Sequence, residues 1–137
     1  SGLQLDELLG AFRDPAVQIA TLVHAEVSAE DLQNVNRIKV IEDLQHNAIY
    51  FSRSALPNMH YAKNSAFPWL RHIGLYAYRS EVLQHIAGLA PCALEQAESL
   101  EQLRWLYYGL PIRLVRTAIE TPNIDVPADL EKVLPFL

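Results

Sequence analysis

Apolar and polar positions follow two different periods along the chain, and these periods predict helices that alternate with strands. Helical spacing of apolar residues, or helix-start signals, predict helices over residues 3–12, 28–34, 80–87, 94–108 and 127–134. Apolar runs and period-2 alternation predict strands over residues 17–27, 37–42, 48–52, 70–78 and 112–119. A short connection joins the second strand to the third and suggests a hairpin. Together these elements predict an α/β fold with a mixed sheet.

Individual residues place several of the boundaries. Ser28 is followed three residues later by Asp31, which is a helix-start signal. Ser80 is expected to cap the helix that follows it, and Gly109 is expected to end the long helix over 94–108. The segment 54–68 shows no clear period, so we expect a long loop there; long ordered loops are often functional.

Two of these elements carry polar groups that a purely structural element does not need. On the strand over 70–78, one face is apolar, with Ile73, Leu75 and Ala77. The other face carries an imidazole and two phenols, from His72, Tyr76 and Tyr78. On the helix over 94–108, a polar stripe runs beside the apolar one and consists of Glu95, Glu98 and Gln102. Such acidic and amide groups beside His and Tyr are typical of a pocket for a polyhydroxylated ligand.

Composition and charge narrow the classes of partner. The chain has 137 residues, half of them hydrophobic, which fits one domain with a buried core. Its net charge is −5 and it has no basic run, so nucleic acid and anionic membrane surfaces are not expected partners. No apolar run is long enough to span a bilayer. Cys92 is the only cysteine, which excludes an internal disulfide and is compatible with the cytoplasm.

Four blocks of sequence carry a resemblance to a known family. They are Tyr50–Ser54 (YFSRS), Arg71–Arg79 (RHIGLYAYR), Leu94–Arg104 (LEQAESLEQLR) and Ile124–Glu131 (IDVPADLE). In this order and at similar spacings, the blocks resemble the C-terminal half of the 3-deoxy-manno-octulosonate cytidylyltransferase family, also called CMP-KDO synthetase. The resemblance covers nearly the whole chain.

The resemblance implies a Rossmann-like nucleotidyltransferase fold, similar to glycosyltransferases of the A type, with its N-terminal nucleotide-binding half missing. We therefore expect residues 1–137 to be a single fragment, the C-terminal sugar-binding and dimerisation half. The implied parent is an enzyme that transfers CMP from CTP to KDO, releases pyrophosphate and serves lipopolysaccharide biosynthesis. It is implied to be a homodimer, and Trp105, Leu106, Tyr107 and Tyr108 are candidates for the interface because aromatic residues are enriched in such surfaces. The fragment alone is expected to be inactive.

Five residues on the family blocks are implied to bind the sugar acid: Arg53, His72, Tyr76, Glu98 and Gln102. The guanidinium of Arg53 is suited to the sugar carboxylate, and the other four are suited to its hydroxyls. Each has a plainer alternative. Without the resemblance, Arg53 is more typical of a surface ion pair and His72 of a satisfied strand residue, and Tyr76 also fits core packing with a tethered hydroxyl. Glu98 and Gln102 fit an ordinary solvated helix face.

The block Ile124–Glu131 is implied to supply a metal ligand, Asp125, for Mg²⁺. The usual family block has Thr after this aspartate and Glu two positions further on, whereas this chain has Val126 and Ala128. The substitution removes a hydroxyl beside the aspartate and changes the local hydrogen bonding. Without the resemblance, Asp125 reads as a capping or turn residue.

Two other functions remain open at this point. The chain fits a binding and dimerisation module that does not catalyse, because the phosphate-binding blocks of the family are not in it. It also fits part of a cytidylyltransferase for another acidic sugar, such as a sialic acid. Glu95, Glu101 and Arg104 are expected to make helix-face or subunit contacts.

Overall fold

The structure is a computed structural model that describes residues 2–62 and 66–118. Its elements, in chain order, are α1 (Gly2–Gly10), the 3-10 turn η1 (Ala11–Arg13), β1 (Ile19–His24), α2 (Ala29–Gln33), β2 (Lys39–Glu42), β3 (Ala48–Ser52), β4 (Arg71–Tyr78), α3 (Ser80–Ala87), α4 (Ala93–Glu98), α5 (Gln102–Tyr107) and β5 (Ile112–Arg116). The predicted helix over 127–134 lies outside the described residues. No helix in the described part of the chain is long and apolar enough to cross a membrane.

The five strands form one sheet in the order β3-β2-β4-β1-β5. β1 runs parallel to β5, whereas it runs antiparallel to β4, and β2 pairs antiparallel with both β3 and β4. The predicted mixed sheet is therefore confirmed, and β4, the strand with the polar face, lies at its centre. The segment 54–62 contains no helix or strand, as predicted for the first part of the long loop.

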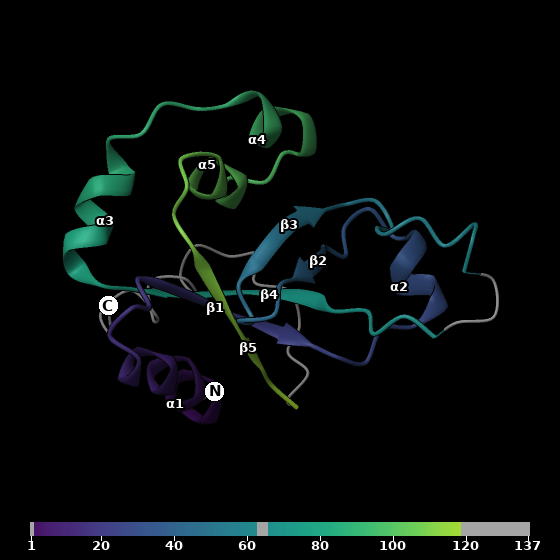
Figure 1. The fold of residues 1–137 in the computed structure, drawn as a ribbon, viewed down its shortest axis with the longest axis horizontal. Coiled ribbons are helices and arrows are strands. Elements are labelled where there is room, and N and C mark those ends of the chain that lie inside the picture. Colours follow the sequence, from purple (N-terminus) through teal and green to yellow (C-terminus); the bar gives the residue numbers. More distant parts are fainter. Residues whose placement is uncertain (1, 63–65, 119–137) are drawn as a thin grey trace.

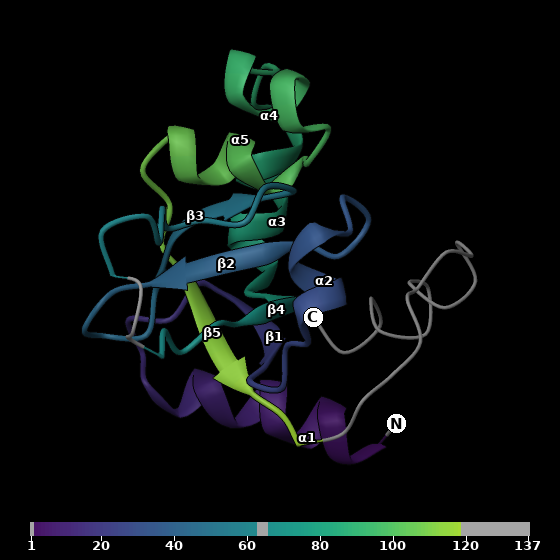
Figure 2. The ribbon, with the colours of Figure 1, turned by 90° about the vertical axis from the view of Figure 1, so that its right-hand side faces the viewer.

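Helices cover both faces of this sheet (Figures 1 and 2). On one face, α1 packs through Leu8 against a cluster that includes Leu22, Ile73 and Leu75. On the other face lie α3, α4 and α5, with the buried residues Val82, Ile86, Leu103 and Trp105. Burial along β4 alternates residue by residue, so its two predicted faces point into two different cores.

Local signals account for the second helix and the hairpin. The Ser28 hydroxyl accepts from the Asp31 N–H at 3.0 Å, and the Asp31 carboxylate accepts from the Ser28 N–H at 3.1 Å. This reciprocal capping box confirms the predicted start of α2. In the hairpin between β2 and β3, the Asp43 carboxylate accepts from the N–H groups of Gln45 and Asn47, which stabilises the turn that the sequence predicted.

The single long helix predicted over 94–108 is wrong. The chain forms two short helices, α4 and α5, because Ser99 adopts a left-handed conformation with φ 56°. A bidentate ion pair then joins the two helices, with Arg104 Nε 2.6 Å from Glu95 Oε1 and Arg104 Nη2 2.7 Å from Glu95 Oε2. Glu95 and Arg104 thus contact each other within the chain.

The predicted capping role of Ser80 is also wrong. Arg79 occupies the N-cap position of α3, so Ser80 is the first helical residue, and no side chain caps this helix. The end of α5 follows the prediction, because Gly109 has a positive φ of 83°, a conformation that glycine adopts without steric cost.

Candidate functional site

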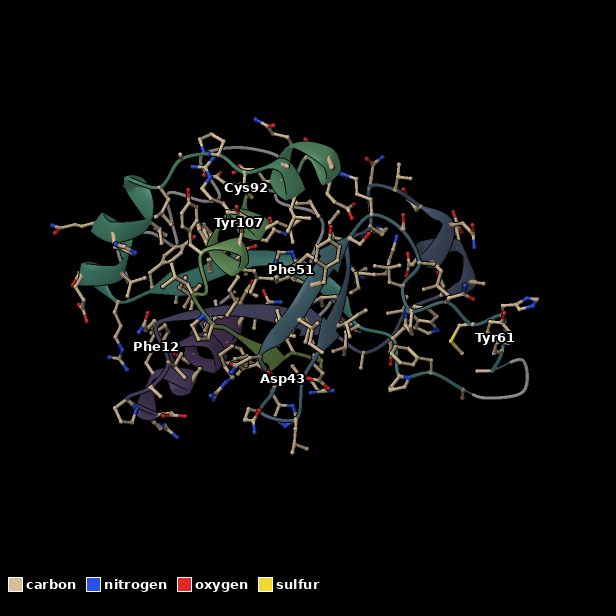
Figure 3. The ribbon with its side chains drawn as sticks, turned by 45° about the horizontal axis from the view of Figure 1, so that its top comes forward. Phe12, Asp43, Phe51, Tyr61, Cys92 and Tyr107 are labelled. Atoms are coloured by element: carbon tan, nitrogen blue, oxygen red, sulfur yellow. The ribbon has the colours of Figure 1, made fainter. Side chains whose placement is uncertain are left out.

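A row of aromatic rings crosses the helix-covered face of the sheet around β4. The ring of His72 packs edge-on against Phe51 of β3, with centroids 4.9 Å apart, and against Tyr76, at 5.3 Å. Trp105 of α5 completes the row, with its ring 5.3 Å from Tyr76 and 5.4 Å from Tyr78. Figure 3 shows Phe51 near the middle of the molecule, whereas Tyr61 lies at its far end. The period-2 alternation of β4 therefore predicted correctly that His72 and Tyr76 lie on one face, and the structure shows that they are in contact.

The side chain of His72 contacts the neighbouring strand β1. Its Nε2 lies 2.9 Å from the hydroxyl oxygen of Thr21, a fully buried residue in the middle of that strand. Burial of the ring disfavours the charged form and lowers the pKa of the His72 imidazole to about 3. At neutral pH the ring is therefore uncharged, with one nitrogen that donates and one that accepts.

Tyr76 brings a hydroxyl into this site that the chain itself does not satisfy. The Tyr76 oxygen is buried and makes no hydrogen bond of ordinary geometry among the described residues, although the Thr21 hydroxyl lies close enough to stabilise its charged form. Burial, with Tyr78 and Glu101 adding to it and Thr21 opposing it, raises the pKa of the Tyr76 phenol well above its ordinary value. The group therefore keeps its proton at neutral pH. A buried hydroxyl without a partner costs free energy, and it is the kind of group that a bound ligand satisfies.

Glu98, at the end of α4, forms the centre of a second polar group. Its carboxylate accepts from the hydroxyls of Tyr50 (3.2 Å) and Ser52 (2.7 Å) and from the N–H of Arg53 (3.0 Å). Burial opposes the ionised form, but these three donors and the charge of Arg53 outweigh it and lower the pKa of the Glu98 carboxyl. Glu98 is therefore not part of a solvated helix face, since it fastens α4 to the end of β3.

The Arg53 side chain strengthens the same junction. Its guanidinium donates to the main-chain carbonyl oxygens of Glu98 (2.6 Å), Val35 (2.8 Å) and Ser99 (3.1 Å). These bonds use three of the five N–H groups that a guanidinium carries. The plainer alternative of a surface ion pair does not describe it, because its partners are carbonyls. The bonds to Glu98 and Ser99 also help to hold the chain in the break between α4 and α5.

Gln102 is buried at the first position of α5. Because the chain breaks after Glu98, the two residues do not lie one turn apart on a single helix, as the sequence suggested. Asp125, the predicted metal ligand, lies outside the described residues. Within residues 2–62 and 66–118, no three His, Cys, Asp or Glu side chains gather where they would hold a metal ion.

The sequence profile of the family described as Cytidylyltransferase matches residues 4–117. The chain belongs to the cytidylyltransferase family. Curated relatives carry the name 3-deoxy-manno-octulosonate cytidylyltransferase. That of Bacteroides thetaiotaomicron is 46% identical over 143 residues, which cover 98% of this chain and 56% of the relative. That of Phocaeicola vulgatus is 44% identical over 141 residues, with the same two coverages of 98% and 56%. This family likeness confirms the resemblance of the four sequence blocks.

A solved structure supports the same family membership. It is described as CMP:2-keto-3-deoxy-manno-octonic acid synthetase complexed with CTP, and it matches with a TM-score of 0.80 and 42% sequence identity. The match covers 97% of this chain and 54% of that one. The predicted α/β nucleotidyltransferase fold with a mixed sheet is therefore confirmed. The chain spans about half the length of the curated relatives it matches.

For this cytidylyltransferase chain, four of the five sugar-binding residues predicted from the sequence fall into two contacting pairs. His72 lies against Tyr76, and Arg53 lies against Glu98. The end of β3 connects the pairs, because Phe51 packs on His72 while Ser52 and the following residue, Arg53, bind Glu98. Whether these side chains bind a sugar stays a prediction.

Three residues that contact this site were not singled out from the sequence: Thr21, Tyr50 and Ser52. A signal existed for Thr21, which is a hydroxyl-bearing residue in the middle of an otherwise apolar strand. Tyr50 and Ser52 alternate with Phe51 on β3, and their role depends on where the end of α4 lies. No local pattern reports that position.

The aromatic residues proposed for a subunit interface behave differently from one another. Trp105 is only 7% exposed and packs in the core between the sheet and the helices of this chain. Its place in the interface list is therefore wrong. Tyr107 and Tyr108 are 62% and 43% exposed, so they remain the candidates for contact with a second subunit.

Proposed function

We propose that this chain is the sugar-binding part of an enzyme that transfers CMP from CTP to 3-deoxy-manno-octulosonate (KDO) and releases pyrophosphate. The observation that carries the proposal is the likeness, in sequence and fold and over nearly the whole chain, to proteins that bear this name. The anomeric hydroxyl of the sugar attacks the α-phosphorus of CTP, a new P–O bond forms, and the bond to pyrophosphate breaks. Such a transfer depends mainly on positioning and on charge neutralisation.

The residues of this chain are proposed to position the sugar. His72 and Tyr76 offer a neutral imidazole and a protonated phenol, which suit sugar hydroxyls as acceptor and donor. Gln102 lies at the start of the neighbouring helix α5 and is proposed for another hydroxyl. Glu98 is proposed to orient Arg53 as well as to meet the sugar, since it already holds the Arg53 main chain.

Arg53 is proposed to bind the carboxylate of the sugar acid. Three of its N–H groups donate to carbonyls, which fixes the plane of the guanidinium. The two remaining N–H groups, one on each terminal nitrogen, are available for an anionic ligand. A guanidinium that is already fixed loses less conformational entropy on binding than a mobile one.

Several further features of the proposed enzyme rest on the family resemblance. Mg²⁺ is proposed as the cofactor, with Asp125 among its ligands; it would neutralise phosphate charge. Since no three His, Cys, Asp or Glu side chains of the described residues gather as metal ligands, the other ligands are proposed to come from elsewhere. CTP is proposed to bind to another part of the complete protein, the part that corresponds to the half of the relatives that this chain does not span. A homodimer, a cytoplasmic location and a role in lipopolysaccharide biosynthesis are also proposed.

The complete gene product, supplied with CTP and Mg²⁺, is expected to release pyrophosphate only when KDO is added. The reason is that KDO is the nucleophile, so without it nothing displaces the pyrophosphate. The measurement is a coupled pyrophosphate assay with three acceptors: none, KDO and N-acetylneuraminate. Residues 1–137 alone, tested in parallel, are expected to be inactive.

Each other outcome points to a different function. Equal rates with N-acetylneuraminate would contradict the KDO assignment and favour a cytidylyltransferase of broader acidic-sugar specificity. A complete gene product that is inactive with both sugars would favour the non-catalytic binding and dimerisation module.

A further inference from the structure

The strand β4 contains an irregularity directly beside the site. Along the antiparallel pair, Tyr76 lies opposite Thr21 but Ile73 lies opposite Leu22, so Gly74 and Leu75 have no partner residue on β1. A bulge of this kind leaves carbonyl groups without their ladder bonds, and bulges commonly re-aim side chains beside functional sites. Here the bulge separates His72 from Tyr76 while keeping both on one face.

The Thr21 side chain satisfies one carbonyl of this bulge and lies near a second. Its hydroxyl donates to the Leu75 carbonyl oxygen at 2.7 Å, and the Ile73 carbonyl oxygen lies 3.3 Å away. A threonine hydroxyl has a single hydrogen and two lone pairs. At 2.7 Å, two oxygens without a hydrogen between them repel each other, so the hydrogen belongs on the Leu75 side.

The same oxygen also lies 2.9 Å from His72 Nε2. The hydrogen of the Thr21 hydroxyl is already donated to the Leu75 carbonyl, so the Thr21 oxygen can only accept a hydrogen bond from His72. His72 Nε2 must therefore carry a proton. The ring is neutral, so a proton on Nε2 leaves Nδ1 with a lone pair. No described residue donates a hydrogen bond to this Nδ1.

We infer that Thr21 is a positioning residue that fixes His72 in the tautomer protonated on Nε2, so that Nδ1 accepts a hydrogen bond from a ligand hydroxyl. The ligand side of this inference rests on the proposed function, in which the ligand is a polyhydroxylated sugar acid. The tautomer itself does not, because it follows from the contacts of Thr21 alone. Phe51 and Tyr76 pack edge-on against the ring and keep its orientation.

The inference predicts that removal of the Thr21 hydroxyl changes which ring nitrogen of His72 is protonated. In Thr21→Val, which has nearly the same shape, Nε2 faces a methyl group. An N–H buried there without an acceptor costs more than a bare lone pair, so the proton is expected to move to Nδ1. Thr21→Ser is the matched control because it keeps the hydroxyl.

The experiment is nitrogen NMR on the complete gene product, labelled with ¹⁵N histidine, near neutral pH. His72→Gln identifies the signals of His72 by their disappearance. The wild type and Thr21→Ser are expected to show Nε2 protonated and Nδ1 unprotonated, and Thr21→Val is expected to show the reverse or a mixture. A wild type with its proton on Nδ1, or an unchanged tautomer in Thr21→Val, would overturn the inference. The wild-type spectrum decides even where the valine variant does not fold.

A second readout connects the tautomer to the sugar. In the complete gene product, Thr21→Val is expected to raise the KM for KDO about three- to tenfold and to leave the KM for CTP unchanged, because one neutral hydrogen bond is lost or reversed. Thr21→Ser is expected to remain within about twofold of the wild type. Because the NMR spectra are recorded without substrate, a failure of the tautomer and a failure of the KDO reaction give separate results.

Discussion

Trp105→Ala is expected to lower the free energy of unfolding by about 3–5 kcal/mol, the range found for large aromatic residues removed from cores. Trp105 is 7% exposed and packs edge-on against the rings of Tyr76 and Tyr78. Its removal leaves a cavity between α5 and β4 and takes away two aromatic contacts. Urea denaturation of the complete gene product measures the effect as a lower midpoint, provided that the slope m stays unchanged.

The matched control lies two residues away on the same helix. Tyr107 is 62% exposed, so Tyr107→Ala is expected to change the free energy of unfolding by no more than about 0.5 kcal/mol in the monomer. With both variants measured below the concentration at which the protein dimerises, a Tyr107→Ala variant as unstable as Trp105→Ala would contradict the assignment of Trp105 to the core and Tyr107 to the surface.

The free energy of unfolding is also expected to decrease as the pH falls below about 6.5, and His72 is the cause. Burial lowers the pKa of His72 from 6.5 to about 3 in the folded chain. Between these two values the unfolded chain binds a proton that the folded chain does not. The stabilisation is therefore fully present above about pH 6.5 and is lost as the pH falls toward the folded pKa, at up to about 1.4 kcal/mol per pH unit.

Carboxyl groups act in a different range of pH. The hydrogen bonds from Arg104 to Glu95, and from Arg53, Ser52 and Tyr50 to Glu98, lower the pKa values of these carboxyls from the ordinary value of 4.5, so their contributions are lost only below about that pH. The interval from about pH 6.5 to about pH 5 therefore isolates the histidine effect.

The comparison uses urea midpoints at about pH 7 and about pH 5 for the wild type, His72→Gln and His85→Gln. His85 lies on the exposed side of α3 and serves as the control. The difference between the two pH values is expected to shrink in His72→Gln and to persist in His85→Gln. A difference of the same size in all three proteins would show that His72 is not the group that titrates.

Local chemistry explains which parts of the fold were predictable. The start of α2 follows from Ser28 and Asp31, whose side chains bond to each other's N–H groups within one turn. The hairpin follows from Asp43, which caps its own turn, and the two faces of β4 follow from alternation. In each case, the residues that decide the structure are neighbours in the sequence.

The break between α4 and α5 was not predictable in this way. The sequence from 94 to 108 keeps a helical apolar spacing and contains neither glycine nor proline, yet Ser99 turns left-handed. The contacts around the break come from afar, since Arg53 binds the carbonyls of Glu98 and Ser99. These bonds span 45 residues or more along the chain, so they are tertiary contacts that no periodicity reveals.

For the candidate site too, the sequence predicted individual residues but not the contacts between distant segments. Alternation on β4 and the family blocks selected His72 and Tyr76, and the fold brings them into contact. They did not reveal that Thr21 from another strand holds His72, because that contact depends on the register between β1 and β4 and on the bulge. The bonds that Glu98 of α4 accepts from Tyr50 and Ser52 of β3 were missed as well, because they too are contacts between residues far apart in the sequence.

The central claim is that this chain carries the sugar side of a CMP-KDO-forming enzyme, and Tyr76→Phe tests it most directly. The substitution removes only the hydroxyl that lacks a partner among the described residues. Loss of an unsatisfied buried hydroxyl does not destabilise the chain, so the free energy of unfolding is expected to stay the same or to rise. The enzyme should nevertheless bind its sugar less well.

The measurement is the KM for KDO and the KM for CTP in the complete gene product, for the wild type, Tyr76→Phe and the exposed control Tyr107→Phe. We expect Tyr76→Phe to raise the KM for KDO about three- to tenfold, as for the loss of one neutral hydrogen bond, and to leave the KM for CTP and the urea midpoint unreduced. We expect Tyr107→Phe to match the wild type. A Tyr76→Phe enzyme with an unchanged KM for KDO, or with a raised KM for CTP alone, would contradict the placement of the sugar on this face of β4.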